Sequence, residues 1–307
     1  MIKKLLVIFC FSSTIVCAQP TRPIKLIVGF AAGSSNDIVA RQIAGDIANN
    51  GGPPIVIENR IGASGDVATA EIINTRDSDD PKLFLASSAL YASTYTVKNN
   101  SFDIANQIQP VSFVGTTPMV LETGRESKIY NLADIAKSQK TLTYGTGGKN
   151  SLTYIGMAYL SNILATSMID IPYQGSGRSL PDVASGRVDL CFDFYSSSRS
   201  FIQSGLLRPI AVTGNTRLPE LPDVPTLKEN GINWPLDSFF MLFASTNLDA
   251  ATVAQIQNIL NRAYVNNYQL YESKGIHPDP RKNKNIKQFH KDMVYHYQSL
   301  KISLNSN

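Results

Sequence analysis

Short apolar runs alternate with segments of helical periodicity along the chain. The first run, residues 25–30, is followed by a loop of small residues and then by Val39, Ile43 and Ile47 at the spacing of one helix face. Because parallel strands need crossover helices between them, this alternation predicts an α/β fold with largely parallel sheets. Further strands are expected at 55–57, 83–85, 142–144, 170–173, 189–194, 209–212 and 239–243. Helices are expected at 66–74, after the loops that end at 151 and 177, at 249–271 and from 285 onward.

The first residues, 1–18, have the composition of a secretory signal peptide. Lys3 and Lys4 precede a short apolar stretch, and small residues follow it up to a cleavage site after about Ala18. The stretch is shorter than the ~20 apolar residues that cross a bilayer, so it predicts export rather than a membrane anchor. Lipidation at Cys17 is less well supported, because a bulky valine precedes that cysteine.

Composition and charge exclude several classes of protein. The chain has 307 residues, 43% hydrophobic and 17% charged, which is enough for a sizeable core and favours two domains over one. The net charge of +4 falls when Lys3 and Lys4 leave with the signal peptide, and we expect no nucleic-acid binding. Cys191 is then the last cysteine, which excludes an intrachain disulfide, and its apolar neighbours predict a buried core residue.

Three junctions between an expected strand and an expected helix are rich in Gly, Ser and Asn, at 30–37, 62–66 and 145–151. A helix start leaves backbone N–H groups without intrahelical partners and carries the positive end of the helix dipole. Such a junction suits a carboxylate or a phosphate. The same residue types also form turns and N-caps with no ligand, so both interpretations stay open for each loop.

Enzyme motifs do not fit the chain. The loop at 145–151 matches neither the P-loop pattern nor the dinucleotide-binding pattern, and no G-x-S-x-G nucleophile elbow occurs. The three histidines, His277, His290 and His296, lie far along the chain from the glycine loops and are expected at the surface or satisfied in the core. We therefore expect no catalytic residue, no metal and no cofactor. A secreted hydrolase using Asp193 or a Ser–His pair remains an alternative, as does an exported protein without a small ligand.

Five sequence blocks, at 22–41, 56–65, 171–176, 205–213 and 217–226, resemble in order those of the Bug-type extracytoplasmic solute receptors. These receptors are the substrate-binding proteins of tripartite tricarboxylate transporters. The block Arg-Leu-Pro-Glu-Leu-Pro-Asp-Val-Pro-Thr, the last of the five, is the most specific. Together the blocks cover nearly the whole chain after the signal peptide.

The resemblance implies a two-lobed periplasmic binding protein of the Venus-flytrap type, which closes on its ligand by hinge motion. Lobe one would comprise residues 19–118 plus 239–307, and lobe two residues 119–238. The two crossing strands of the hinge would lie near 116–121 and 238–243. It also implies a periplasmic monomer that captures a small organic carboxylate for uptake or sensing. Its partners would be transporter membrane subunits or a sensor, and it would not be an enzyme.

The resemblance further implies that the first loop holds a carboxylate through backbone N–H groups, partly through ordered water. Asp37 would either favour its helix N-terminus or accept a hydrogen bond from an ammonium or hydroxyl group of the ligand. The implied ligand-binding residues of lobe one are Phe30, Ala31, Ala32, Gly33, Ser34, Ser35, Asp37, Ser87 and Ser88. Those of lobe two are Gly147, Gly148, Ser151, Tyr173, Gly175, Ser176 and Asp193.

The chain departs from the family pattern at several of these positions. Ser34 and Ser35 stand where the family usually has two glycines, so two side chains enter the carboxylate loop. Asn150 replaces a usual glycine and Tyr154 a usual histidine, and residues 80–83 replace a usual Asp-Gly-Tyr-Thr. These departures leave the identity of the ligand open.

Overall fold

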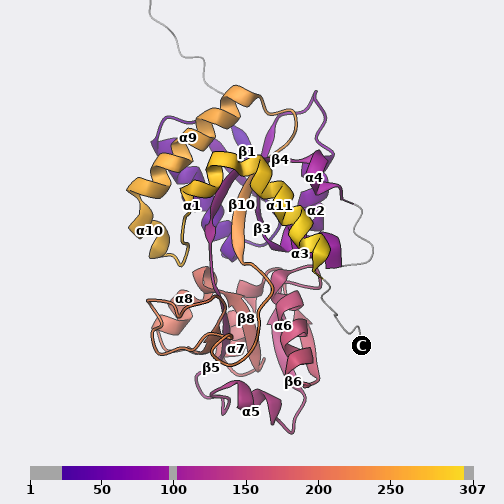
Figure 1. Ribbon diagram of the computed structural model, residues 1–307, viewed down its shortest axis with the longest axis vertical. Coiled ribbons are helices and arrows are strands. Elements are labelled where there is room, and N and C mark those ends of the chain that lie inside the picture. Colours follow the sequence, from indigo (N-terminus) through magenta and orange to yellow (C-terminus); the bar gives the residue numbers. More distant parts are fainter. Residues whose placement is uncertain (1–22, 97–101, 301–307) are drawn as a thin grey trace, which may run out of the picture.

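The computed structural model describes residues 23–96 and 102–300, and the expected signal peptide lies outside the described residues. Figure 1 shows two lobes, one above the other along the long axis, each built around its own sheet with helices packed against it. The sheet of lobe one contains, in spatial order, β2 (Ile55–Asn59), β1 (Ile24–Val28), β3 (Lys82–Ser87), β10 (Phe239–Ala244) and β4 (Gln109–Thr116). Its helices are α1 (Ser35–Asn49), α2 (Asp66–Ile73), α3 (Ala89–Thr96), α4 (Ile104–Gln107), α9 (Ala250–Asn266), α10 (Tyr268–Glu272) and α11 (Ile286–Ser299).

Lobe two has the same number of strands and fewer helices. Its sheet contains, in spatial order, β7 (Met168–Pro172), β6 (Leu142–Thr146), β8 (Leu190–Phe194), β5 (Met119–Gly124) and β9 (Leu207–Val212). Its helices are α5 (Leu132–Ala136), α6 (Leu152–Ile163), α7 (Leu180–Ala184) and α8 (Tyr195–Gln203). Among the described residues, no helix is both long and apolar enough to cross a membrane.

The two sheets are mixed, which corrects the expectation of largely parallel sheets. In each lobe three strands are parallel, β2-β1-β3 and β7-β6-β8, as βαβ connections require. The strands β10 and β5 pair antiparallel to both of their neighbours. Each of these two strands follows a connection from the other lobe, so it enters its sheet from the interlobe side. It therefore runs in the direction opposite to the strands of the βαβ units in that sheet.

Two connections join the lobes. The first is short, since only Thr117 and Pro118 separate β4 from β5. The second is the segment between β9 and β10. The two lie side by side, because the Thr117 amide donates to the carbonyl of Ser238 at 3.0 Å and the Met119 amide to Oγ1 of Thr213 at 2.9 Å. Relative motion of the lobes therefore has to bend both connections at one place.

Aromatic side chains fill the core of lobe one. Tyr91 stacks on Tyr297 with ring centroids 5.8 Å apart and also packs on Phe239. His290 lies within this cluster, with Nδ1 2.7 Å from the Tyr91 hydroxyl and Nε2 2.9 Å from the carbonyl of Ile104. Burial lowers the pKa of His290, so the ring is neutral at pH 7, with Nε2 donating and Nδ1 accepting. The expectation of a histidine satisfied in the core is confirmed for His290.

Cys191 lies on β8 and is fully buried, as its apolar neighbours predict. Its side chain belongs to a small cluster of lobe two with Leu180, Val183 and Leu207. Burial raises the pKa of the thiol well above its ordinary value, and the nearby Glu122 and Asp193 carboxyls raise it further. The thiol is therefore a packing group at neutral pH and a poor nucleophile.

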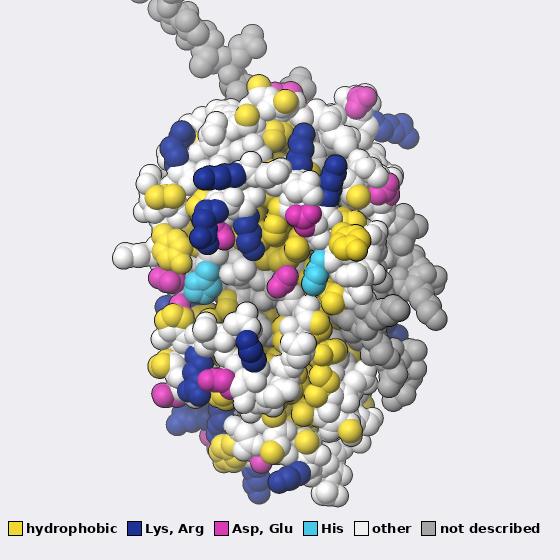
Figure 2. Space-filling view, viewed as in Figure 1, with side chains coloured by type: hydrophobic (Ala, Val, Ile, Leu, Met, Phe, Trp, Pro, Cys, Tyr) yellow, Lys and Arg dark blue, Asp and Glu magenta, His cyan; other side chains and the backbone are white. Residues whose placement is uncertain are grey.

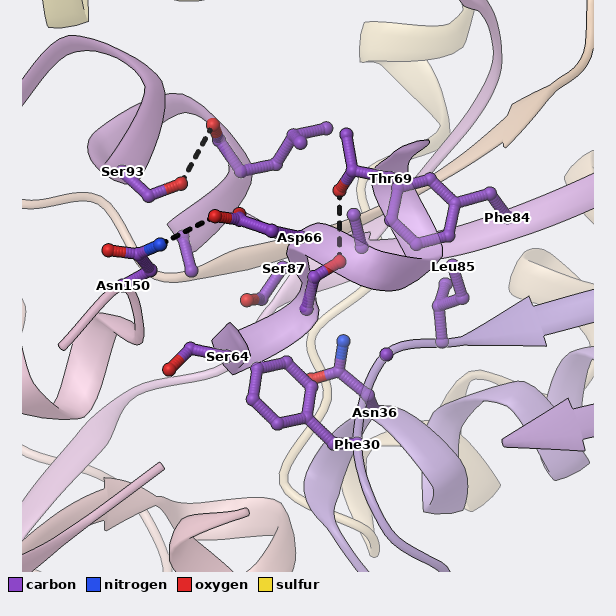
Figure 3. A pocket seen from close by; sticks show the side chains of 15 residues that line it. Phe30, Asn36, Ser64, Asp66, Thr69, Phe84, Leu85, Ser87, Ser93 and Asn150 are labelled. Atoms are coloured by element: carbon purple, nitrogen blue, oxygen red, sulfur yellow. Dashed lines mark hydrogen bonds between the residues drawn. The ribbon is translucent and has the colours of Figure 1, made fainter. Parts of the chain in front are cut away.

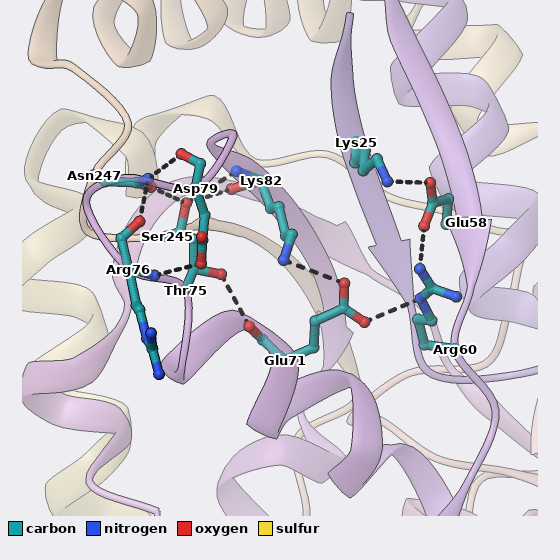
Figure 4. Close-up of polar contacts among 10 residues, drawn as sticks. All are labelled: Lys25, Glu58, Arg60, Glu71, Thr75, Arg76, Asp79, Lys82, Ser245 and Asn247. Carbon is teal, nitrogen blue, oxygen red and sulfur yellow. Dashed lines mark hydrogen bonds and ion pairs between the residues drawn. The ribbon is translucent and has the colours of Figure 1, made fainter.

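A chain of ion pairs connects three strands and a helix of lobe one (Figure 4). Glu58 pairs with Lys25 at 2.9 Å and with Arg60 at 2.6 Å, and Glu71 pairs with Arg60 at 3.0 Å and with Lys82 at 3.3 Å. The chain links β1, β2, α2 and β3, and each partly exposed pair is worth ~0–1 kcal/mol. On the face shown in Figure 2, positive and negative side chains both occur over both lobes.

Candidate functional site

Loops that follow parallel strands of the two lobes meet each other across the cleft. The loop after β1 contacts the loop after β7, since the Ala31 amide donates to the carbonyl of Gln174 at 3.1 Å. Gly175 adopts a φ of +126°, and a Cβ atom there would lie 3.4 Å from the Cβ of Ser34. Glycine at this position therefore allows both the left-handed conformation and the close approach of the lobes.

A small cavity lies between these loops, and we call it the amide compartment. It has room of about 20 Å³, enough for about one water molecule, with the lobes in the observed arrangement. Side chains and backbone from both lobes form its walls. The lining residues are Phe30, Ser34, Ser35, Asn36, Ser87 and Ala89 of lobe one and Gly147, Ser151, Leu152, Thr153, Gly175, Ser176 and Phe194 of lobe two.

The N-termini of α1 and α6 both reach the amide compartment. Ser34 caps α1 by accepting from the Asp37 amide at 3.3 Å, and Ser151 caps α6 by accepting from the Tyr154 amide at 3.2 Å. Within the described part of the chain, the amides of the first two residues of each helix form no hydrogen bond; these are Ser35, Asn36, Leu152 and Thr153. Two positive helix ends from opposite lobes therefore line one small cavity, which favours an anion there.

A second cavity adjoins the first, and we call it the acidic compartment (Figure 3). It also has room of about 20 Å³, and it shares Phe30, Asn36, Ser87 and Ala89 with the amide compartment. Its distinctive side chain is Asp66, the first residue of α2, which accepts a hydrogen bond at 2.7 Å from the side-chain amide (Nδ2) of Asn150 in lobe two. Its other lining residues are Gly29, Ser64, Gly65, Thr69, Phe84, Leu85, Ala86, Leu90 and Ser93.

Asp37 lies behind the first loop and does not line either compartment. Its side chain, 2% exposed, accepts hydrogen bonds from the Gly33 amide at 3.0 Å, from Arg41 at 2.9 and 3.0 Å and from Asn59 at 3.1 Å. Burial alone would raise the pKa of Asp37, but these hydrogen bonds and the Arg41 charge hold it below its ordinary value. Asp37 is placed to brace the loop from inside lobe one.

The other implied residues of lobe one divide into lining and supporting positions. Phe30, Ser34, Ser35 and Ser87 line the amide compartment. The Ser88 hydroxyl instead donates to the carbonyl of Asp237 at 2.6 Å, which ties the end of β3 to the second interlobe connection. The Ala31 amide is used by Gln174, while Ala32 and Gly33 are exposed on the outside of the loop.

The implied ligand-binding residues of lobe two also divide into lining and supporting positions. Gly147, Ser151, Gly175 and Ser176 line the amide compartment. Asp193 lies one layer deeper, where it accepts from the Ser176 hydroxyl at 2.6 Å and from the Phe194 amide at 2.7 Å. Burial raises its pKa, with these hydrogen bonds opposing the shift. Gly148 meets lobe one, since a Cβ atom there would lie 2.4 Å from Ser64 Oγ. The Tyr173 hydroxyl points away to Asp182 at 2.7 Å.

The implied site omits several residues that the structure places in the cleft. Asn36, Leu152 and Thr153 contribute unpaired amides, and Phe194 and Ala89 contribute apolar walls. Asp66 and Asn150 contribute the interlobe hydrogen bond. The signal for most of them was available, because they belong to the three glycine-rich and serine-rich junctions or begin the helix that follows one.

The histidines are placed away from the two compartments. His290 is held between Tyr91 and Ile104, as described above. His277 lies beside β4, where its amide donates to the carbonyl of Thr116 at 2.8 Å, and His296 packs edge-on against Tyr297 in α11. In the part of the chain that the structure describes, no histidine lines either compartment.

Comparison with known proteins identifies the family. The family model described as "Tripartite tricarboxylate transporter family receptor" matches residues 39–305. The protein is 26% identical over 245 residues to a UPF0065 protein of Bordetella bronchiseptica, covering 79% of this chain and 72% of the relative. It is 27% identical over 251 residues to protein BugT of Bordetella pertussis, covering 80% of this chain and 77% of the relative.

Solved structures agree with this at the level of the fold. The periplasmic binding protein BugD superposes with a TM-score of 0.83 at 22% identity, covering 91% of this chain and 96% of its own. MatC of Rhodopseudomonas palustris, solved with malate, superposes with a TM-score of 0.82 at 22% identity, covering 91% of this chain and 99% of its own. Another R. palustris protein, solved with adipate, superposes with a TM-score of 0.82 at 24% identity, covering 91% of this chain and 96% of its own. The fold is that of two-lobed periplasmic binding proteins, and the chain belongs to the receptor family of tripartite tricarboxylate transporters.

Proposed function

We propose that this protein binds a small organic carboxylate between its lobes, with a carboxylate group held in the amide compartment. The observation that carries the proposal is the meeting of two helix N-termini, those of α1 and α6, which come from opposite lobes. Each offers amides without intrahelical partners and the positive end of a helix dipole. The Ser87 hydroxyl, which forms no hydrogen bond within the described residues, adds an uncharged donor.

Relatives support this ligand class. Two structural neighbours are described with bound malate and adipate, which are both carboxylates. An anion that contacts both helix N-termini at once would stabilise the arrangement in which the lobes meet. Its differential affinity for that arrangement would then drive hinge closure. Binding rather than catalysis is the proposed activity.

The remaining parts of the proposal concern cellular placement and organisation. The signal peptide would be removed after about Ala18, leaving a monomeric periplasmic receptor. Lobe one would be residues 19–118 plus 239–307 and lobe two residues 119–238, with the hinge in the two connections. Closure around the ligand would present one surface to the membrane subunits of a transporter, or to a sensor.

The test begins with protein that has been unfolded and refolded to remove ligand. Its thermal unfolding is measured with a panel of mono-, di- and tricarboxylates and amino acids. A ligand at 100 times its Kd adds about 2.7 kcal/mol of stability, which is easily seen as a rise in Tm. Calorimetry then measures the Kd of each acid that raises the Tm.

Two variants at one position locate the bound carboxylate. Aspartate and asparagine are both good N-caps, so Ser34→Asp and Ser34→Asn should each preserve the start of α1. Only Ser34→Asp adds a negative charge beside the amide compartment. We expect it to weaken acid binding at least tenfold relative to Ser34→Asn. Equal affinities for the two variants, or a flat panel with the folded protein, would contradict the proposed function.

A further inference from the structure

Asp66 is a half-buried carboxylate in the cleft that lacks a cationic partner. Oδ2 accepts one hydrogen bond, from Asn150, and no hydrogen bond reaches Oδ1 among the described residues. No lysine, arginine or histidine in that part of the chain pairs with it. Burial raises the pKa of Asp66, and the bond from Asn150 only partly opposes this. The start of α2 gives a further partial compensation.

Asp37 makes the contrast clear, since it lies in the first turn of α1 as Asp66 lies in the first turn of α2. Arg41 and Asn59 donate to its carboxylate, and the loop amide of Gly33 completes the set. The Asp37 carboxylate therefore has hydrogen-bond donors on both oxygens without a ligand. Asp66 has one neutral partner, from the other lobe, and its carboxylate lines a cavity (Figure 3).

The two compartments lie close enough for one small molecule to reach both. They share four lining residues, Phe30, Asn36, Ser87 and Ala89, so at most one layer of side chains lies between them. A carboxylate held by the helix N-termini would then place its neighbouring substituents beside Asp66. An ammonium or hydroxyl group there can donate to Oδ1, whereas a second carboxylate would meet a like charge.

We propose that Asp66 determines specificity, selecting acids that carry an ammonium or hydroxyl group close to the carboxylate and disfavouring dicarboxylates. This rests on the proposed function, because it assumes that a carboxylate occupies the amide compartment. The ligand class that follows is a short amino acid or hydroxy acid. In this the chain would differ from the relatives that are described with malate and adipate, each of which has two carboxylates.

The experiment compares matched acids of three to six carbons. For each chain length the set contains the unsubstituted monocarboxylic acid, its 2-amino and 2-hydroxy derivatives and the dicarboxylic acid. Calorimetry measures the Kd of each for the stripped protein and for Asp66→Asn, which is nearly isosteric and keeps an acceptor for Asn150. Asp66→Glu keeps the charge, and Glu126→Gln removes the same charge from a side chain that is 94% exposed, far from the cleft.

We expect the best amino or hydroxy acid to bind the unmodified protein at least tenfold more tightly than its matched dicarboxylate. Asp66→Asn should reduce that ratio at least tenfold, Asp66→Glu should keep its direction, and Glu126→Gln should leave it unchanged. A ratio that Asp66→Asn alters less than twofold would overturn the role of Asp66, while leaving carboxylate binding intact. Dicarboxylates that bind the unmodified protein as tightly as amino or hydroxy acids would do the same. Failure of every acid to bind would overturn the proposed function, and this inference with it.

Discussion

Replacing Asp37 by asparagine should destabilise lobe one and weaken all ligands by a similar factor. The carboxylate accepts from Arg41, Asn59 and the Gly33 amide, and Asn59 also donates to the carbonyl of Phe30 at 2.8 Å. Asp37 is therefore the point at which helix α1, strand β2 and the first cleft loop are joined. An asparagine side chain has one acceptor oxygen and cannot replace the paired bonds to Arg41.

The magnitude follows from the exposure of each partner. The Arg41 side chain is 58% exposed, so the ion pair itself contributes only ~0.5 kcal/mol. The bonds from Gly33 and Asn59 reach a charged group that is 2% exposed, and losing their strength costs about 1.5 kcal/mol more. The sum of about 2 kcal/mol corresponds to a fall in Tm of about 3 °C for a chain of this length, at an unfolding entropy of ~2.1 cal/mol/K per residue.

Urea and thermal unfolding, followed by circular dichroism without ligand, measure this loss, with Glu126→Gln as the control. The pKa of Asp37 is held below its ordinary value in the folded protein. The difference between the unmodified protein and Asp37→Asn should therefore be complete at pH 7 and shrink as the pH falls below about 4. Calorimetry should give a similar loss of affinity for unsubstituted, amino and hydroxy acids. Unchanged stability, with a loss confined to amino and hydroxy acids, would refute the bracing role and place Asp37 against the ligand.

Three further outcomes are expected. Asn150→Ala removes the interlobe bond to Asp66 and should weaken ligand binding about tenfold by calorimetry, because such a charge-assisted bond contributes ~1.5 kcal/mol. The pKa of His290 is lowered by burial, so stability in urea should fall as the pH drops below about 6.5, and His290→Gln should flatten that slope. Burial raises the pKa of Glu122 well above its ordinary value, and the nearby Asp193 carboxyl raises it further. Stability should therefore be lost as the pH rises above about 4.5, and Glu122→Gln should reduce that loss in urea titrations between pH 4.5 and 8.

The helices, strands and loops that depend on interactions between residues close in the sequence could be predicted. The apolar runs of β1 and β6 are followed by loops of small residues and then by helices that Ser34 and Ser151 cap, and these junctions line the cleft. The strands β4 and β5 gave no such signal. Ser112 and Glu122 interrupt their apolar pattern, although both are buried, and Ser112 is satisfied by Tyr264, which lies far along the chain. Helix α8 begins Tyr-Ser-Ser-Ser, a composition typical of a loop, and packing against β8 and β9 overrides it.

The hydrogen bonds between the lobes inside the cleft could not be predicted from the sequence. The junction that contains Asp66 and the loop that contains Asn150 could each be located as an anion-suited turn. Their hydrogen bond joins residues 84 positions apart on different lobes, and only the approach of the lobes creates it. One difference between the two carboxylates was visible in the sequence, because Arg41 follows Asp37 at the i,i+4 spacing of a helix whereas Ala70 follows Asp66. The bond from Asn59 to Asp37 spans 22 positions and depends on the fold.

We expect the interlobe contacts to set the rate of binding as well as its strength. Each compartment has room for about one water molecule, so an acid should enter only when the Ala31–Gln174 and Asp66–Asn150 bonds have broken. Asn150→Ala should therefore raise the association rate constant while it lowers the affinity. The dissociation rate constant should then rise by a larger factor than the Kd does. The single tryptophan, Trp234, belongs to the second interlobe connection and packs on Phe192, so its fluorescence can follow closure in stopped flow. An unchanged association rate constant would mean that ligands enter without separating the lobes, and the contacts would then act on affinity alone.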